Sequence, residues 1–131
     1  MIFVDTNYFL RYLLSDNEKQ YLIASKLIEE AALGTKELFT STIVFFELQL
    51  VLGSVYNKQK ANIVPILKSI LASLPFIRIE ERSLLEESLG LYEEESVSLA
   101  DCYNLLVARD RKVETFATFD QKLLKLYPSI K

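Results

Sequence analysis

The chain has 131 residues, half of them hydrophobic and a quarter charged, and its net charge is −3. This length suits one domain that buries about two-thirds of the surface of the unfolded chain. The absence of histidine excludes Ser-His-Asp and Cys-His catalysis and zinc sites ligated by histidine. The acidic balance also disfavours nucleic-acid binding by bulk charge, but it leaves open binding through metal ions that clustered acids hold.

No linker, repeat or low-complexity tract interrupts the sequence, so we predict a single domain over residues 1–131. Cys102 is the only cysteine, which excludes an internal disulfide and fits a reducing cytoplasm. No basic segment precedes Asp5, so no signal peptide is expected. Polar residues interrupt the most apolar stretch, residues 39–56, which therefore favours a buried helix over a membrane span.

Short apolar runs alternate with amphipathic stretches along the chain. Strands are predicted at residues 2–4, 37–40, 76–79 and 113–117, and helices at residues 8–14, 18–33, 43–55, 61–74, 82–95, 99–109 and 120–126. No hairpin signal appears, and every connection is long enough for a helix, so the pattern favours an α/β fold with a parallel sheet. The first strand is an uninterrupted apolar run, which is typical of a strand buried on both faces.

Four carboxylates stand close to points where a predicted strand gives way to a helix. Asp5 follows the first strand and Asp120 the fourth. Glu47 is the one charged residue of the apolar helix at residues 43–55, and Asp101 lies in the first turn of a later helix. Because the carboxyl ends of parallel strands meet at one edge of a sheet, we expect these four side chains to converge there.

Each acid also has a purely structural explanation. Asp5 and Asp120 suit the N-cap position of a helix, and Asp101 completes a capping box that begins at Ser98. Glu47 also fits a solvent-facing stripe or an ion pair with an arginine. If Glu47 is buried, it requires a partner or a cation, because an unpaired buried carboxylate is costly.

Convergence of the four acids indicates a metal site. Four carboxylates with no histidine or lysine nearby repel one another unless cations lie between them. Ligands that are all oxygen select a hard ion, Mg²⁺ or Mn²⁺. Asn104 lies one turn after Asp101 on the same side of its helix, where its amide can share the metal or its bound water. Such a site can hydrolyse a phosphodiester.

The ordered set of acidic motifs resembles that of the PIN-domain nucleases. The set consists of residues 4–7 (VDTN), Glu47, residues 98–101 (SLAD) and residues 117–120 (ATFD), and it covers essentially the whole chain. The size is similar to that of the compact VapC-type toxins of bacteria and archaea. The resemblance implies a three-layer α/β/α sandwich with a central parallel sheet of four or five strands. A fifth strand has room only at residues 129–131.

The resemblance further implies a metal-dependent endoribonuclease that acts as the toxin of a toxin–antitoxin pair. The implied ligands of Mg²⁺ or Mn²⁺ are Asp5, Glu47, Asp101 and Asp120, and the implied groups that hold the carboxylates or metal-bound water are Thr6, Asn7 and Thr118. The implied partners are a second copy of the chain, an RNA substrate and a small antitoxin that inserts a segment into the active-site groove.

Other functions remain open at this point. A structure-specific DNA nuclease, or an RNA-processing enzyme outside any toxin pair, would use the same four acids. A phospho-acceptor signalling domain shares the doubly wound fold, but it needs a second acid at the first strand and a lysine directly after a strand, and both are missing. A binding module without activity would have no need for intact acids.

Overall fold

The structure, a computed structural model, describes residues Met1–Lys131 and contains three strands and seven helices. The strands are β1 (Ile2–Phe3), β2 (Leu38–Thr40) and β3 (Ile77–Ile79). The helices are α1 (Thr6–Leu14), α2 (Glu18–Ala32), α3 (Thr42–Ser54), α4 (Lys60–Ser73), α5 (Arg82–Glu94), α6 (Leu99–Asp110) and α7 (Gln121–Ile130). None of these helices combines the length and the apolar character that a membrane span requires.

The chain divides into two compact units, Met1–Arg82 (unit 1) and Ser83–Lys131 (unit 2), which are described separately. The single domain expected from the sequence stays a prediction.

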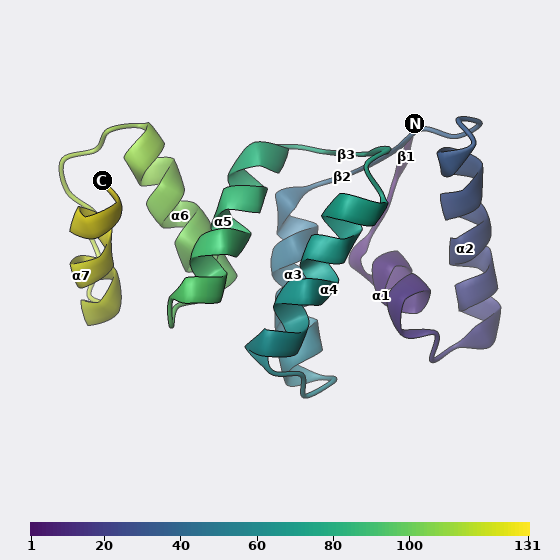
Figure 1. Cartoon of the computed structure of the whole chain (residues 1–131), viewed down its shortest axis with the longest axis horizontal. Coiled ribbons are helices and arrows are strands. Elements are labelled where there is room, and N and C mark those ends of the chain that lie inside the picture. The colour runs from purple at the N-terminus through teal and green to yellow at the C-terminus, as the bar shows by residue number, and fades with distance from the viewer. The chain divides into compact units, whose positions relative to one another are not determined.

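Unit 1 is built on a parallel sheet, as the alternating pattern predicted. The strand order is β1-β2-β3, and both pairs of neighbours run parallel (Figure 1). Leu38 in the middle strand lies opposite Ile2 on one side and Ile77 on the other. This register puts the three residues in one row across the sheet, so they share a face.

The two faces of the sheet differ in burial, and the prediction of a first strand buried on both faces is wrong. Leu38 and Ile77 are fully buried, whereas Phe3, on the opposite face, is 46% exposed. The Phe3 ring packs edge-on against the Phe39 ring, with centroids 5.1 Å apart. Residues 2–4 are all apolar although one face of the strand is exposed, because Phe3 on that face packs against another aromatic ring.

The helices of unit 1 form two pairs (Figure 1). α1 packs against α2, where the rings of Tyr12 and Tyr21 stack, and α3 packs against α4. α1 also contacts α3 through the rings of Phe9 and Phe45, which are buried in the core. α2 ends where predicted, because Gly34 adopts a φ of 83°, which favours glycine.

Unit 2 has a small core of its own. Leu105 of α6 and Leu123 and Tyr127 of α7 are buried together, and Leu91 of α5 and Phe116 pack against them. α6 contacts α7 along this core. The Tyr127 hydroxyl donates to the Val113 carbonyl at 2.8 Å, so the polar group of this buried side chain has a hydrogen-bond partner.

The fourth strand predicted at residues 113–117 is wrong, because the sheet has three strands. In this segment the Val113 carbonyl accepts from the Tyr127 hydroxyl, and the Glu114 carbonyl accepts from Lys131 Nζ at 3.1 Å. Side chains at the end of the chain therefore supply partners that a neighbouring strand would otherwise supply. The β-branched and aromatic residues of this segment are typical of a strand, but the segment forms no backbone hydrogen bonds with a neighbouring strand.

A strand at residues 129–131 is also excluded, because α7 continues to Ile130. The closing helix is therefore longer than the predicted 120–126. The Ser129 hydroxyl donates to the Leu126 carbonyl at 2.7 Å, a local bond within the helix. Such a bond satisfies a polar side chain in the last turn and favours helix over an isolated strand.

An arginine ties α1 to α2 within unit 1. Arg11 donates from Nε to Gln20 Oε1 at 2.6 Å and from Nη1 to Asp16 at 3.0 Å. Asp16 also accepts from the Tyr56 hydroxyl at 3.0 Å. The hydroxyl of Tyr56 and the guanidinium of Arg11 hold the pKa of Asp16 below its ordinary value of 3.8.

The Asp16 network predicts a pH-dependent contribution to stability. A group whose pKa is lowered by folding stabilises the fold above its unfolded pKa, and this contribution is lost as the pH falls through the folded pKa. We therefore expect Tyr56→Phe to lower resistance to urea at neutral pH, and we expect the deficit to shrink below about pH 4. Tyr12→Phe is the control, because no hydrogen bond involves its hydroxyl. A deficit that is constant across this pH range would contradict the assignment.

Candidate functional site

Asp5 connects β1 to α1 and leaves its carboxylate free. It occupies the N-cap position of α1 with an extended backbone (φ −87°, ψ 166°), but its side chain makes no capping hydrogen bond. Its backbone carbonyl instead accepts from the Tyr8 amide at 3.1 Å. The structural explanation as an N-cap therefore fails for this carboxylate, which is exposed and available to a ligand.

Glu47 comes close to Asp5 in the fold through Thr6, the residue that follows Asp5. The Thr6 hydroxyl, in a side chain only 5% exposed, donates to Glu47 Oε2 at 2.6 Å. Glu47 itself is exposed, which favours the solvent-facing stripe over a buried carboxylate. Its apolar surroundings in the sequence arise because Ile43 and Leu50, on the same face of α3, are exposed as well.

The sequence interpretation missed Thr40, which positions the start of the site. Thr40 ends β2 and is fully buried, and its hydroxyl donates to the Val4 carbonyl at 2.8 Å. Val4 is the last residue before Asp5, so this bond holds the backbone that carries the first acid. A hydroxyl residue at the end of an apolar strand was the available signal.

Asp101 lies in the first turn of α6 in unit 2, as predicted. The Ser98 hydroxyl caps this helix and accepts from the Asp101 amide at 3.1 Å. The capping explanation thus holds for the backbone of Asp101. The carboxylate itself is not needed for the cap, and Asn104 lies exposed one turn further along the helix.

Asp120 is both an N-cap and a candidate ligand. Its Oδ1 accepts from the backbone amides of Lys122 at 2.8 Å and Leu123 at 3.3 Å, which leaves Oδ2 available. Thr118 accepts from the Asp120 amide at 3.1 Å, so this hydroxyl holds the backbone of Asp120 rather than its carboxylate.

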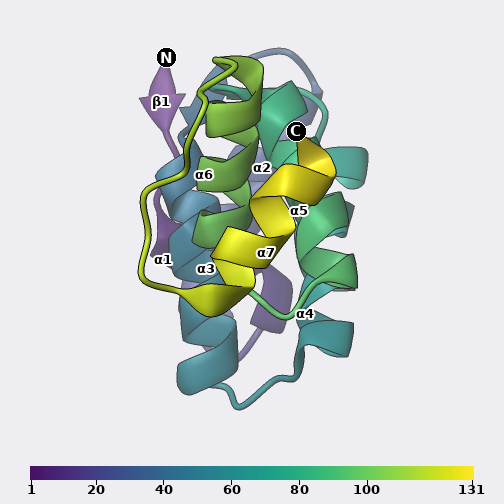
Figure 2. The same cartoon turned by 90° about the vertical axis from the view of Figure 1, so that its left-hand side faces the viewer.

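The acids of unit 2 lie at corresponding positions on two packed helices. α6 and α7 contact each other and run in the same sense (Figures 1 and 2). Asp101 is in the first turn of α6, and Asp120 caps the start of α7. The four acids are therefore divided between the units, Asp5 and Glu47 in unit 1 and Asp101 and Asp120 in unit 2, and we refer to these as the two acid pairs. Neither unit alone gathers three side chains that could hold a metal ion, and the convergence of the pairs stays a prediction.

The chemistry of the four acids fits a hard cation. None of them forms an ion pair, although Arg11 and Arg109 pair with other acids in the same units. Three of the four carboxylates accept no backbone amide hydrogen bond. Oxygen donors without a protein cation match the preference of Mg²⁺ and Mn²⁺.

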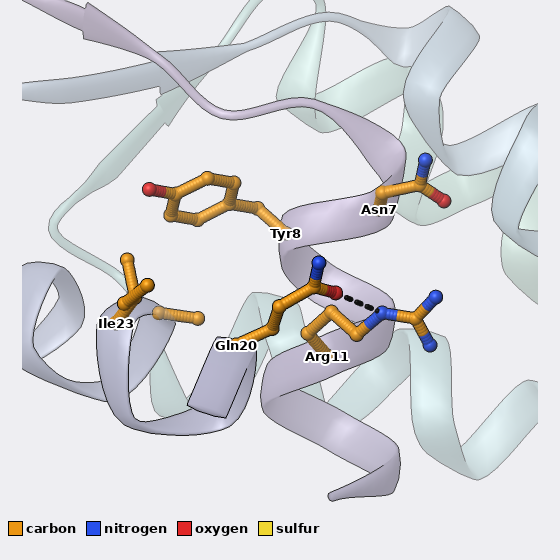
Figure 3. A pocket seen from close by; sticks show the side chains of 6 residues that line it. Asn7, Tyr8, Arg11, Gln20 and Ile23 are labelled. Carbon is orange, nitrogen blue, oxygen red and sulfur yellow. Dashed lines mark hydrogen bonds between the residues drawn. The ribbon is translucent and has the colours of Figure 1, made fainter. Parts of the chain in front are cut away.

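Asn7 lines a hollow in unit 1. The hollow lies between α1 and α2 and has a volume of about 310 Å³. The Tyr8 ring and the Ile23 side chain reach toward it from the two helices, while Gln20 and Arg11 are joined by a hydrogen bond (Figure 3). Asn7 is exposed and keeps its amide free of hydrogen bonds to side chains.

Comparison with known proteins identifies the family. The PIN domain family model matches residues 2–127, and the chain belongs to this family. The chain is 25% identical over 126 residues to the VapC ribonuclease of Aquifex aeolicus (strain VF5), an alignment that covers 96% of this chain and 92% of that protein. No solved structure matches the chain. The resemblance drawn from the four acidic motifs is thereby confirmed.

The Thr40 bond predicts a stability cost for removing one hydroxyl. Thr40→Val keeps the shape of the side chain but leaves the buried Val4 carbonyl without this donor, so we expect unfolding free energy to fall by about 1–3 kcal/mol. Thr35→Val is the matched control, because its hydroxyl also bonds a carbonyl but is exposed to water. Urea titration measures both variants. An equal loss in the two variants would contradict a special role for Thr40.

Proposed function

We propose that this chain is an endoribonuclease that depends on Mg²⁺ or Mn²⁺ and acts in the cytoplasm as the toxin of a toxin–antitoxin pair. The observation that carries the proposal is the set of four unpaired carboxylates in a PIN-domain chain. The VapC ribonuclease relative supports RNA as the substrate over DNA.

We assign the metal ligands to Asp5, Glu47, Asp101 and Asp120. This assignment requires the two acid pairs to meet, as they would in a three-layer α/β/α sandwich. When bound, a divalent ion supplies Lewis-acid activation of a phosphodiester and of water. Charge neutralisation by the ion also removes the mutual repulsion that four adjacent carboxylates would otherwise suffer.

Protein groups around the acids hold them in one orientation. The Thr6 hydroxyl fixes one oxygen of Glu47, and two backbone amides at the start of α7 fix one oxygen of Asp120. In each of these carboxylates, the hydrogen bonds to one oxygen also fix the direction in which the other oxygen points. Such preorganisation lowers the cost of arranging charge during phosphodiester hydrolysis.

Amides near the acids complete the proposed site. Asn7 follows Asp5 on α1, and Asn104 follows Asp101 on α6. Both side chains are exposed, and an amide can donate to a phosphate oxygen while accepting from water. We assign these two residues to holding the substrate phosphate and the attacking water.

The proposed toxin role includes two protein partners. A small antitoxin is expected to inhibit the enzyme by inserting a segment into the active-site groove, and a second copy of the chain is expected to form a homodimer. Similarity to the VapC ribonuclease supports the first expectation, whereas the homodimer rests on the family resemblance alone. Co-expression with the product of a neighbouring small gene tests the first expectation, and light scattering tests the second.

Metal removal is expected to abolish activity. Protein treated with EDTA should not cleave RNA, and Mg²⁺ or Mn²⁺ should restore cleavage, because the ligands are carboxylates that bind hard ions. The assay uses RNA and DNA of the same sequence, and product sequencing locates the cut. Equal cleavage by the EDTA-treated protein contradicts the proposal. Preferential cleavage of DNA supports the structure-specific DNA nuclease instead.

Asp101→Asn is expected to separate activity from stability. The amide cannot replace a carboxylate ligand, so we expect cleavage to fall by at least about 100-fold. The loss of a negative charge in the first turn of α6 should cost less than about 1 kcal/mol of unfolding free energy.

Asp110→Asn is the matched control, because it removes an acid at the other end of the same helix. Cleavage assays in Mg²⁺ and urea titration measure both variants. The site assignment is falsified if Asp101→Asn cleaves RNA as fast as the wild-type protein.

A further inference from the structure

A second hollow lies in unit 2, between α7 and the turn that joins α5 to α6. Its volume is about 370 Å³. Lys122 and Lys125 line it from α7, and Glu95 and Ser96 line it from the turn. Lys122 and Lys125 are three residues apart on a helix, so their side chains lie on the same face.

The charge of this hollow contrasts with that of the rest of unit 2. The unit has six Lys and Arg against nine Asp and Glu, whereas the hollow has two lysines and one glutamate. α7 itself contains no acidic residue between Gln121 and Ile130. The hollow is therefore a local positive surface on an acidic unit.

The hollow adjoins the elements that carry the two acids of unit 2. Lys122 Nζ donates to the Ser96 carbonyl at 3.4 Å, which holds the ammonium group at the turn. The amide of the same lysine donates to Asp120 Oδ1. The turn leads directly to Ser98, whose hydroxyl caps the helix of Asp101. Lys122 thus connects the turn that precedes the helix of Asp101 to the N-cap that Asp120 forms.

We propose that Lys122 and Lys125 bind backbone phosphates of the RNA substrate beside the acids of unit 2. The inference rests on the proposed ribonuclease function. Lysine is a compact point charge with three donors, so it binds phosphate without reading the base. Contacts of this kind set the register of a nucleic acid and supply affinity independent of sequence. An acidic protein needs such a local surface, because its net charge repels RNA.

The test measures RNA affinity at several salt concentrations. Fluorescence anisotropy follows binding of a short unstructured RNA by the full chain in the non-cleaving Asp101→Asn background. Each phosphate contact to single-stranded RNA contributes about 0.7 to the slope of log affinity against log salt. We expect Lys122→Gln and Lys125→Gln each to reduce that slope by about 0.7, and the double variant by about 1.4.

Two controls accompany these variants. Lys26→Gln removes an exposed lysine from α2 of unit 1 and should leave the slope unchanged. Lys125→Arg keeps the charge and should retain the slope of the parent. In the cleaving protein, Lys125→Gln should raise KM and leave kcat unchanged, because the contact positions the substrate rather than acting on the reacting atoms.

The outcomes distinguish this inference from the proposed function. If the wild-type protein cleaves RNA but the two glutamine variants keep the slope of Lys26→Gln, the phosphate site is overturned and the ribonuclease stands. If the wild-type protein does not cleave RNA, the proposed function fails and the inference fails with it.

Discussion

The hydrogen bond from Thr6 to Glu47 is the interaction on which the candidate site depends. It joins the start of α1 to the second turn of α3, and it brings together two acids that are 42 positions apart in the sequence, Asp5 and Glu47. Thr6 is nearly buried, so water competes little for its hydroxyl. Thr40 supports the same region by binding the last carbonyl before Asp5. Two hydroxyl side chains therefore determine where the acids of unit 1 can lie.

Unit 2 positions its acids by a different means. Asp101 and Asp120 lie at the amino-terminal ends of α6 and α7, where backbone amides and the helix dipole favour negative charge. The same feature that stabilises each helix therefore stabilises an ionised carboxylate. Capping and metal binding are compatible because capping by Asp120 occupies only one of its two carboxylate oxygens. A helix cap in this chain is thus no argument against a role in the site.

Charge distribution bears on the proposal that this acidic chain acts on RNA. The net charge of −3 opposes the approach of a polyanion, and the carboxylates of the site add to that repulsion. Divalent ions at the acids and lysines on α7 would each convert a part of the surface from repulsive to attractive. Such an arrangement would confine attraction to the neighbourhood of the proposed site, so that affinity for RNA would depend on a few positions rather than on overall charge.

The sequence by itself determined the parallel sheet, its three strands and the seven helices, because apolar periodicity and the residues that follow each strand are local properties. The same local pattern also predicted a strand at residues 113–117 that the fold does not form. Tertiary structure decided which hydroxyls and carboxylates pair. The exposure of Glu47 depends on which face of α3 is left uncovered, and the side chains of Tyr127 and Lys131 satisfy the carbonyls of residues 113–114. No local pattern in the sequence marks Lys122 and Lys125, and only the turn beside them forms the hollow that they line. Contacts between residues distant in the chain follow from packing, which a local pattern does not encode.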